Sequence, residues 1–184
     1  MSSNIMKIEN FSKLFPEIKI CSGALFNDER GFFSKNLFSK EFKTLMPNVD
    51  EVFFTSSKKN VIRGMHFQTK PYELKKIIYC VEGEILDVFL DVRYDSKTFG
   101  QFDSIKLKEG EAKSIYIPNG FAHGYATLSN NSKIVYLQSG NYMPEYEYTI
   151  NPMSIEFDWL VNKPIISKKD SISTSFDKFA NNLN

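Results

Sequence analysis

The chain has little of several residue types that would support common kinds of site. Among its 184 residues are only two histidines and two cysteines, Cys21 and Cys80. Two histidines exclude any centre built from three imidazoles, and two cysteines are too few for a disulfide framework. Cys80 lies in the apolar run KKIIYCVEG, which predicts a buried thiol.

Long apolar runs and a charge of one sign are also missing. No stretch of about 18 apolar residues predicts a transmembrane helix, and the N-terminus has no apolar segment of signal-peptide length. We therefore expect a cytoplasmic protein. Lys and Arg number 23 and Asp and Glu 22, a net charge of +1. This balance gives no electrostatic reason to expect nucleic acid or membrane partners.

The composition is that of a folded protein, with 42% hydrophobic and 24% charged residues. The length favours a single domain over residues 1–184. Short runs with a period of two recur without helices between them: VIRGMHF, LKKIIYCV, EILDVFLDV, KSIYIP, GYATL and KIVYLQS. This spacing is typical of a sandwich, jelly roll or barrel. Helical patterns are confined to SKEFKTLMP (39–47) and to a polar C-terminal stretch from about residue 167.

The strand 85–93 carries two acids on one of its faces. Asp87 and Asp91 alternate with Ile85 and Phe89, whereas the opposite face is wholly aliphatic. Such acids are either solvated on an outer face or enclosed in a polar cavity of the barrel. A carboxylate in a sheet buried on both faces must be paired or hydrogen-bonded. We favour the cavity, with the solvated face as the alternative.

Several polar side chains in other strand-like runs are candidates for chemistry. His66 and His123 have bulky apolar neighbours, which suits hydrogen-bonded core histidines as well as catalytic ones. A metal site of two histidines and a carboxylate is a further alternative. Arg63 suits diphosphate oxygens because its fork binds two of them at once. Taken singly, Arg63, Lys76 and Tyr136 are also compatible with ordinary structural roles.

Six segments in order cover most of the chain: DERGFF (28–33), RGMHFQ (63–68), LKKIIYCVEGEILDVFLDVRYDSKTFG (74–100), IPNGFAHGYATLS (117–129), VYLQSGNYMPEYE (135–147) and ISKKD (166–170). Through them, residues 24–170 resemble the dTDP-4-dehydrorhamnose 3,5-epimerase family of sugar-nucleotide epimerases. The resemblance implies a cupin-type jelly-roll barrel with a few short helices. It also implies a homodimer that exchanges N-terminal strands, and a reaction with no metal and no organic cofactor.

The resemblance also implies roles for individual residues. His66 corresponds to the family's general base, Asp170 to its carboxylate partner and Tyr136 to its general acid. Lys76 corresponds to the active-site lysine and His123 to the histidine of AHG. The remaining matches are to positions that bind the nucleotide sugar: Arg30, Phe33, Arg63, Gln68, Tyr142, Glu147 and Lys169. Among these, Phe33 is expected to pack on the base from a neighbouring subunit.

The implied reaction inverts C3, C5 or both in a nucleotide-diphospho-4-keto-6-deoxy sugar used for surface polysaccharides. The keto group acidifies the neighbouring carbons, so His66 can remove a proton to give an enolate, and Tyr136 returns one to the opposite face. Lys76 and His123 supply charge to the enolate oxygen. From strand alternation alone, we expect Asp87 to orient Lys76.

Three positions depart from the family pattern. Lys35 stands where the family has a Glu that contacts thymine, and Glu51 and Phe53 replace a Gln and an Asn. Because lysine cannot accept a hydrogen bond from thymine, the preference for thymidine that the resemblance implies is open. The nucleotide is expected to be dTDP, GDP or CDP, with GDP or CDP on a deoxyhexose or heptose as the hypothesis that Lys35 favours. Other readings of the same residues are a C3-only or C5-only epimerase, a 3,4-ketoisomerase, and a sugar-nucleotide-binding cupin without turnover.

Overall fold

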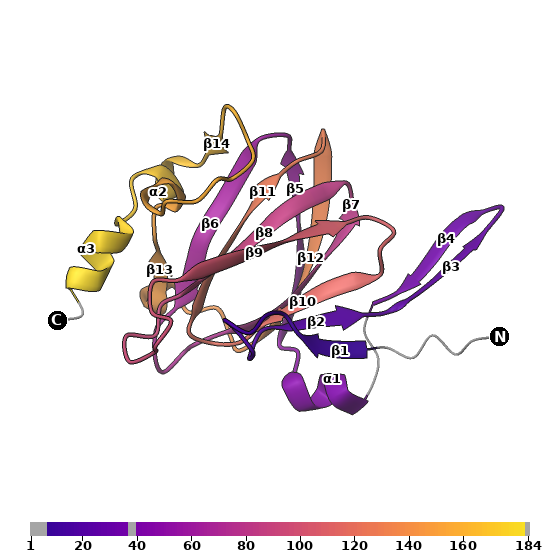
Figure 1. Ribbon diagram of the computed structural model, residues 1–184, viewed down its shortest axis with the longest axis horizontal. Coiled ribbons are helices and arrows are strands. Elements are labelled where there is room, and N and C mark those ends of the chain that lie inside the picture. The colour runs from indigo at the N-terminus through magenta and orange to yellow at the C-terminus, as the bar shows by residue number, and fades with distance from the viewer. Residues whose placement is uncertain (1–6, 37–39, 183–184) are drawn as a thin grey trace.

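Two antiparallel sheets face each other in the computed structural model, which describes residues 7–36 and 40–182 (Figure 1). The first sheet has the order β1 (Lys7–Asn10), β2 (Lys19–Ser22), β10 (Lys113–Ile117), β7 (Lys75–Glu82), β12 (Asn131–Ser139) and β5 (Glu51–Lys58). The second has the order β13 (Glu147–Thr149), β6 (Val61–Gln68), β11 (Phe121–Thr127), β8 (Glu84–Asp91) and β9 (Phe102–Lys108). The predicted all-β class is confirmed.

Short helices and one short parallel strand complete the chain. Strand β14 (Ile165–Ile166) pairs with β6, and the hairpin of β3 (Ala24–Asp28) and β4 (Gly31–Lys35) forms a sheet of its own. The helices are α1 (Lys40–Leu45), α2 (Lys168–Ser171) and α3 (Phe176–Asn181), with 3-10 turns η1 (Pro144–Tyr146) and η2 (Pro152–Ser154). The helix expected at 39–47 is thus present as α1, although residue 39 lies outside the described residues. Within the described ranges, no helix has the length and apolarity to cross a membrane.

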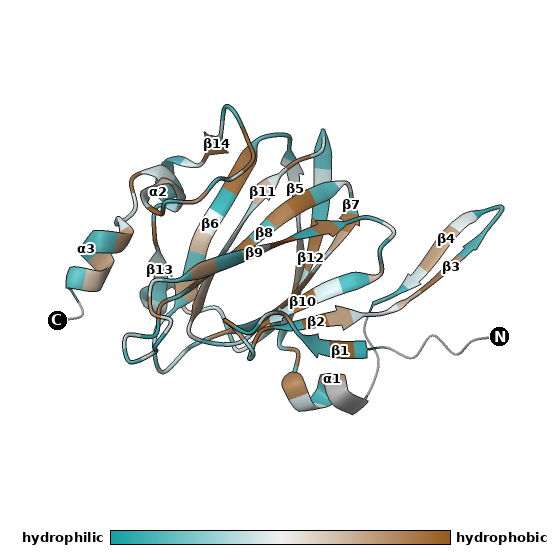
Figure 2. Ribbon diagram, viewed as in Figure 1, coloured by the Kyte–Doolittle hydropathy of each residue, from teal (hydrophilic) through white to brown (hydrophobic). Residues whose placement is uncertain are grey.

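Strand β8 is buried on both faces, as its alternation predicts. Ile85 and Phe89 pack between the two sheets, whereas Leu86 and Leu90 pack under the C-terminal segment that includes Trp159. Hydrophobic residues follow the central strands, and the loops and the hairpin tip are hydrophilic (Figure 2). The site residues therefore lie on strands that a packed core holds rigidly.

The two acids of β8 have different surroundings, although both are fully buried. Asp91 accepts hydrogen bonds from Arg93, Ser96 and Thr98, which hold its pKa below the usual range against the effect of burial. Asp91 is therefore a structural carboxylate, and the prediction that it lines the cavity is wrong. Asp87 faces the interior, so the solvated outer face is excluded for both acids.

Two glycines let strands β6 and β11 approach closely beside the histidines. A Cβ atom at Gly64 would lie 2.5 Å from the Cα of Gly124, and Gly64 has φ +134°. Only a residue without a side chain fits this contact and this backbone conformation. The register then places His123 directly opposite His66, with an irregularity before Tyr125. The glycines of RGMH and AHG thus bring the two imidazoles together.

The β3–β4 hairpin extends away from the barrel (Figure 1). Its Phe26 and Phe33 rings stack with centroids 6.1 Å apart, and both are more than half exposed. At the tip, Arg30 is ion-paired with Asp28. Exposed aromatic rings on a projecting hairpin are unusual on a monomeric surface and are typical of a surface that another chain covers.

Candidate active site

A cavity of about 250 Å³ lies between the two sheets. It is lined by most of the predicted site residues: Arg63, His66, Gln68, Lys76, His123, Tyr136, Tyr142 and Glu147. Strands β6 and β11 of one sheet supply the histidines, and strands β7 and β12 of the other supply Lys76 and Tyr136. The arrangement therefore places imidazoles on one wall and a phenol and an ammonium group on the other.

His66 is held by a carboxylate behind it. Its Nε2 lies 2.9 Å from Oδ1 of Asp170, which is buried, whereas the imidazole is 34% exposed. Ser167 caps helix α2 by accepting a hydrogen bond from the Asp170 backbone N–H. The capped turn fixes the carboxylate, and the carboxylate fixes the plane of the ring.

The charge of Asp170 determines which nitrogen of His66 is basic. Burial raises the pKa of Asp170, but hydrogen bonds from His66, the Gly64 backbone and Ser167 outweigh it and leave the pKa below its usual range. A carboxylate only accepts hydrogen bonds, so Nε2 of His66 carries the ring proton and donates a hydrogen bond to Asp170. Nδ1 is then the unprotonated nitrogen that can take a proton from carbon.

Tyr136 lies on the opposite wall between two rings. Its ring stacks on Phe53 with centroids 4.8 Å apart and planes 9° from parallel, and it meets His123 edge-on at 6.0 Å. Burial, with the nearby Tyr125 and Asp87, raises the pKa of the phenol well above its usual value. Thr55 and Arg63 act in the opposite direction. The phenol is therefore protonated at neutral pH and can act as an acid.

Lys76 points into the same cavity. Burial lowers its pKa to about 8, although Asp87 and Glu147 favour the charged form. Register places Lys76 opposite Gln138 on β12, which also lines the cavity. At neutral pH the group is mainly an ammonium ion, and it can give up its charge only slightly above that pH.

The buried Asp87 bonds to a residue other than the one expected. Its Oδ2 lies 2.7 Å from Nε2 of His123, while its Oδ1 has no hydrogen-bond partner among the described residues. Asp87 acts on Lys76 only through its charge. The expectation that Asp87 orients Lys76 is therefore wrong as regards direct contact. Burial raises the pKa of Asp87 and lowers that of His123, so it favours the uncharged forms of both.

The cavity mouth carries a small ionic network. Oε2 of Glu147 accepts from Lys169 Nζ at 2.6 Å and from the Tyr142 hydroxyl at 2.7 Å. These contacts hold the pKa of Glu147 below its usual range, although burial opposes them. Glu51 accepts a hydrogen bond from the backbone N–H of Tyr142. The predicted residues Tyr142, Glu147 and Lys169 thus meet, joined by Glu51.

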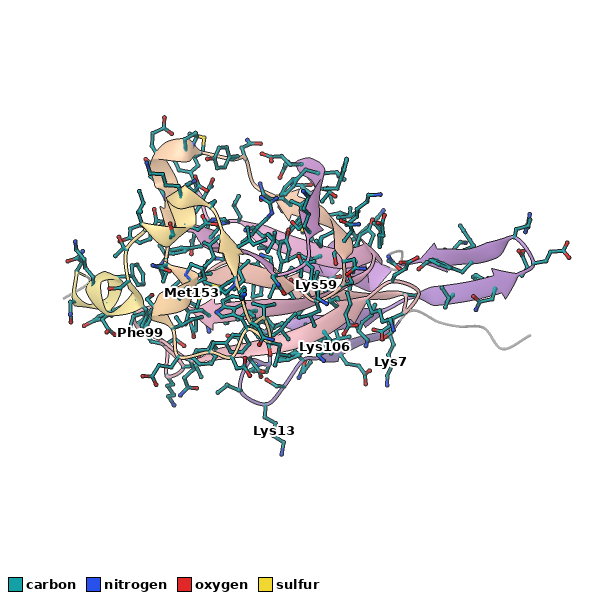
Figure 3. The ribbon with its side chains drawn as sticks, turned by 90° about the horizontal axis from the view of Figure 1, so that it is seen from above. Lys7, Lys13, Lys59, Phe99, Lys106 and Met153 are labelled. Atoms are coloured by element: carbon teal, nitrogen blue, oxygen red, sulfur yellow. The ribbon has the colours of Figure 1, made fainter. Side chains whose placement is uncertain are left out.

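Two predicted residues lie outside this assembly. Arg30 and Phe33 belong to the β3–β4 hairpin. This hairpin projects away from the barrel in both perpendicular views (Figure 1 and Figure 3). Neither lines the cavity of its own chain.

Sequence reasoning assigned no site role to six residues that line the cavity: Phe53, Thr55, Phe67, Leu74, Tyr125 and Gln138. Alternation along 51–58 and 131–139 places three of them on inward faces. Tyr125 follows His123 at the same spacing of two. The alternation of residues was visible in the sequence, but assigning these residues to one cavity required knowing which strands face each other.

No three His, Cys, Asp or Glu side chains gather into a metal-binding group in the part of the chain that the structure describes. Both cysteines are buried and free, and burial raises the pKa of each thiol to about 11. The predicted burial of Cys80 is confirmed.

Comparisons with known proteins agree on one family. The family model described as dTDP-4-dehydrorhamnose 3,5-epimerase matches residues 13–178. A curated enzyme of that name from Shigella flexneri is 35% identical over 172 residues, covering 91% of this chain and 92% of the relative.

Solved structures give the same result. The dTDP-6-deoxy-D-glucose-3,5-epimerase of Legionella pneumophila, in complex with dTDP-4-keto-L-rhamnose, has a TM-score of 0.86 and 31% identity and covers 94% of each chain. A 3'-monoepimerase from Streptomyces bikiniensis, in complex with dTDP-quinovose, has a TM-score of 0.84 and 25% identity, covering 91% of this chain and 87% of that one. The expected cupin-type jelly roll is confirmed.

Proposed function

The chain belongs to the dTDP-4-dehydrorhamnose 3,5-epimerase family and is thus an isomerase of the racemase and epimerase class, and we propose that it inverts C3 and C5 of a dTDP-linked 4-keto-6-deoxy sugar. One observation carries the proposal. His66 on β6 and Tyr136 on β12 lie on opposite walls of one cavity. Inversion needs a proton to leave one face of a carbon and another to arrive on the opposite face, and this placement serves both steps.

The first step is removal of a proton beside the keto group. Nδ1 of His66 takes the proton, the C–H electron pair moves into a C=C bond, and the keto oxygen becomes an enolate oxygen. Asp170 stabilises the resulting imidazolium, because its Oδ1 already accepts a hydrogen bond from Nε2, 2.9 Å away. A positioned base of this kind contributes roughly 10²–10⁴-fold to the rate.

The second step is protonation from the other side. The O–H bond of Tyr136 breaks, the enolate double bond supplies electrons for the new C–H bond, and the C=O bond forms again. Phe53 and His123 confine the Tyr136 ring, so its hydroxyl is held at one place in the cavity. A fixed acid delivers the proton to one face only.

Lys76 stabilises the enolate between these steps. It is the cationic group on the wall that also carries Tyr136, and a charge held in a partly dry site stabilises a developing oxyanion strongly. His123 is hydrogen-bonded to Asp87, and burial lowers its pKa. It therefore holds this part of the wall in place and does not supply the charge expected from the sequence.

We assign the sugar ring, and not the whole nucleotide sugar, to the cavity of about 250 Å³. The diphosphate would then lie at the mouth, where Arg63 is exposed and Lys169 is 61% exposed. Lys169 is paired with Glu147, and a diphosphate would compete with that carboxylate for the ammonium group. This arrangement suits a charged group at the entrance and a neutral ring inside.

The experiment that tests the proposal is NMR of the enzyme with dTDP-4-keto-6-deoxyglucose in deuterated water. Inversion at both carbons, with deuterium at both, is the expected result. Inversion at C3 alone is the second candidate, favoured by the similarity to the 3'-monoepimerase. Absence of exchange and inversion at both carbons would overturn the epimerase assignment for this substrate.

Arg30 and Phe33 would act in a homodimer in which each β3–β4 hairpin reaches the partner's cavity. The exposed Phe26 and Phe33 rings support this part of the proposal, because covering exposed aromatic rings with a partner subunit removes apolar surface from water and stabilises the dimer. The hairpin would also carry Lys35 to the base of the nucleotide. Its ammonium group lies 5.7 Å from the Phe33 ring centroid.

Nucleotide preference is tested by binding of dTDP, GDP and CDP side by side, to the wild type and to Lys35→Glu. We expect preference for dTDP, with a further gain in Lys35→Glu because a carboxylate accepts the thymine N–H. Preference for GDP or CDP in the wild type would reassign the nucleotide. A cytoplasmic location remains a prediction from the sequence.

A further inference from the structure

The side chain of Gln68 lies between two loops at the cavity mouth. It is at the end of β6, is 3% exposed and belongs to the cavity lining. Its Nε2 donates hydrogen bonds to the backbone oxygen of Tyr72 at 2.5 Å and to that of Asn141 at 3.2 Å. Its Oε1 accepts a hydrogen bond from the backbone N–H of Met143 at 2.7 Å. The amide therefore joins the loop after β6 to the loop after β12.

These partners determine which way the amide points. Carbonyl oxygens only accept hydrogen bonds and a backbone N–H only donates. The NH₂ group must therefore face Tyr72 and Asn141, while the side-chain oxygen must face Met143. Both N–H groups of Gln68 thus serve the backbone of the two loops, although the side chain lies in the cavity wall.

Residues 140–143 form the second of these loops, here called the mouth loop. Side chains from another strand also hold its backbone. Gly140 donates its N–H to Oδ2 of Asp50 at 2.7 Å, and Tyr142 donates its N–H to Oε1 of Glu51 at 2.9 Å. Both acceptors lie at the beginning of β5, in the sheet opposite β6. Together with the amide on β6, they fix the mouth loop from both sheets.

The mouth loop carries Tyr142, which is part of the ionic network at the entrance. The Tyr142 hydroxyl donates to Oε2 of Glu147 at 2.7 Å, and Lys169 donates to the same oxygen. Glu147 lies directly opposite Gln68 in the pairing of β13 with β6. A shift of the mouth loop would therefore separate Tyr142 from the groups expected to meet the diphosphate, and Gln68 is placed to prevent that shift.

The other loop, residues 69–74, gives the amide a fixed support. The backbone N–H of Thr69 donates to the Tyr146 oxygen at 3.0 Å, and that of Tyr72 donates to the Thr69 oxygen at 3.0 Å. The rings of Tyr72 and Tyr146 have centroids 4.4 Å apart. The backbone oxygen of Tyr72 that receives the amide is therefore on a loop that packs against η1, the turn that follows the mouth loop.

We propose that Gln68 is a positioning residue for nucleotide-sugar binding, whose amide, with the carboxylate of Glu51, holds the mouth loop so that Tyr142 stays at the entrance. The inference rests on the proposed function, because it takes the cavity mouth as the place of the diphosphate. It gives Gln68 and Glu51 a role that needs no contact with substrate. A loop that leaves its binding-competent position lowers the apparent affinity in proportion to the competent fraction that is lost.

The kinetic test uses Gln68→Met, which removes the three hydrogen bonds at similar side-chain size. We expect KM for dTDP-4-keto-6-deoxyglucose to rise by about 10-fold, the effect of leaving buried backbone groups unpaired at the mouth loop. The kcat value should stay near that of the wild type. Gln101→Met, at an exposed glutamine, is the matched control and should match the wild type. A fall in kcat with unchanged KM would overturn the positioning role.

Glu51 allows a second test with a conservative rescue. Glu51→Ala removes the acceptor of the Tyr142 N–H, whereas Glu51→Gln keeps an oxygen that can accept it. We expect Glu51→Ala to raise KM by about threefold, the effect of one ordinary hydrogen bond, and Glu51→Gln to stay near the wild type. Equal increases in both variants would overturn the part of Glu51 in holding the loop.

A double variant shows whether Gln68 acts through Tyr142. In a Tyr142→Phe background, adding Gln68→Met should raise KM much less than it does in the wild type. The reason is that the hydroxyl which the loop positions is already gone, so the two effects are not additive. Full additivity would mean that Gln68 acts on the substrate by another route, and it would overturn the proposal.

A further measurement needs neither substrate nor turnover. Amide hydrogen exchange in the ligand-free enzyme reports opening of the mouth loop. In Gln68→Met, the segment 140–146 should exchange at least about tenfold faster than in the wild type. Core strand β8 should keep its protection, which shows that the fold is retained, and Gln101→Met should change neither segment.

The exchange experiment also separates this inference from the proposed function. Unchanged exchange over 140–146 in Gln68→Met, with a wild type that epimerises the dTDP sugar, would overturn the role of Gln68 alone. Faster exchange in Gln68→Met, with a wild type that neither binds nor epimerises that sugar, would instead overturn the proposed function.

Discussion

Nε2 of His66 and Oδ1 of Asp170 lie 2.9 Å apart, although the two residues are 104 positions apart in the chain. The pairing of β14 with β6 explains how they meet. Ile165 and Ile166 run parallel to Val61 and Ile62, and the capped turn of α2 follows at once. One short parallel strand therefore positions the carboxylate behind the base.

Asp170→Asn should lower kcat by about 10²–10⁴-fold with the fold retained. An amide can present its NH₂ group to Nε2, which favours the wrong tautomer of His66 and leaves the imidazolium without a countercharge. Steady-state kinetics with circular dichroism measures this. Asp177→Asn, at an exposed acid in the first turn of α3, should match the wild type. Full activity of Asp170→Asn would remove Asp170 from the mechanism.

Tyr136→Phe should separate the two half-reactions. Proton removal by His66 continues, so deuterium still enters the substrate, but the proton for the opposite face is missing and inversion fails. NMR in deuterated water follows both events in one sample. If exchange and inversion fall by the same factor, another group shares the acid role.

The activity should have an alkaline limit near pH 8, the pKa of Lys76. Below that pH the ammonium form is present to stabilise the enolate. As the pH rises through 8, the charge is lost, and the rate should fall about tenfold for each further pH unit. Lys76→Arg keeps its charge to higher pH and should lose this limit, whereas Lys133→Arg, at the exposed ion pair with Glu82, should keep it. A wild-type profile without the limit would exclude the charge of Lys76 from catalysis.

Mixing two inactive variants tests whether the hairpin serves the partner. His66→Ala has intact hairpins, and Arg30→Ala combined with Phe33→Ala has intact cavities. If hairpins are exchanged, dissociation and reassociation of an equal mixture should restore roughly a quarter of the wild-type sites, as random pairing of subunits in a symmetric dimer requires. No recovery in a mixture shown to contain mixed dimers would place Arg30 and Phe33 outside the partner's cavity.

The sequence predicts which face of a strand a residue lies on better than it predicts which residue it contacts, and Asp87 shows why. Alternation along 85–93 assigns Asp87 to the interior, but the identity of its partner depends on which strand lies beside β8. That strand is β11, 30 or more positions later in the chain, and its His123 comes within 2.7 Å. Lys76 is on the opposite sheet. Contact between distant strands is set by register, which one sequence does not specify.

The family resemblance identified most of the residues that line the cavity, because its motifs lie on strands of both walls. RGMH and AHG locate the two histidines, while VYLQS locates Tyr136. Thr55 and Tyr125 carry no motif of their own, and they meet through a hydroxyl contact between residues 70 positions apart. Such a contact appears only once the two sheets are placed face to face.

The contact between Gly64 and Gly124 makes the reaction sensitive to a single methyl group. In Gly64→Ala, every reacting side chain is still present, yet the new carbon would collide with the neighbouring backbone. Strands β6 and β11 would have to separate, and His66 would move relative to Tyr136. Catalysis therefore depends on the lack of a side chain at Gly64 as much as on the groups that transfer protons.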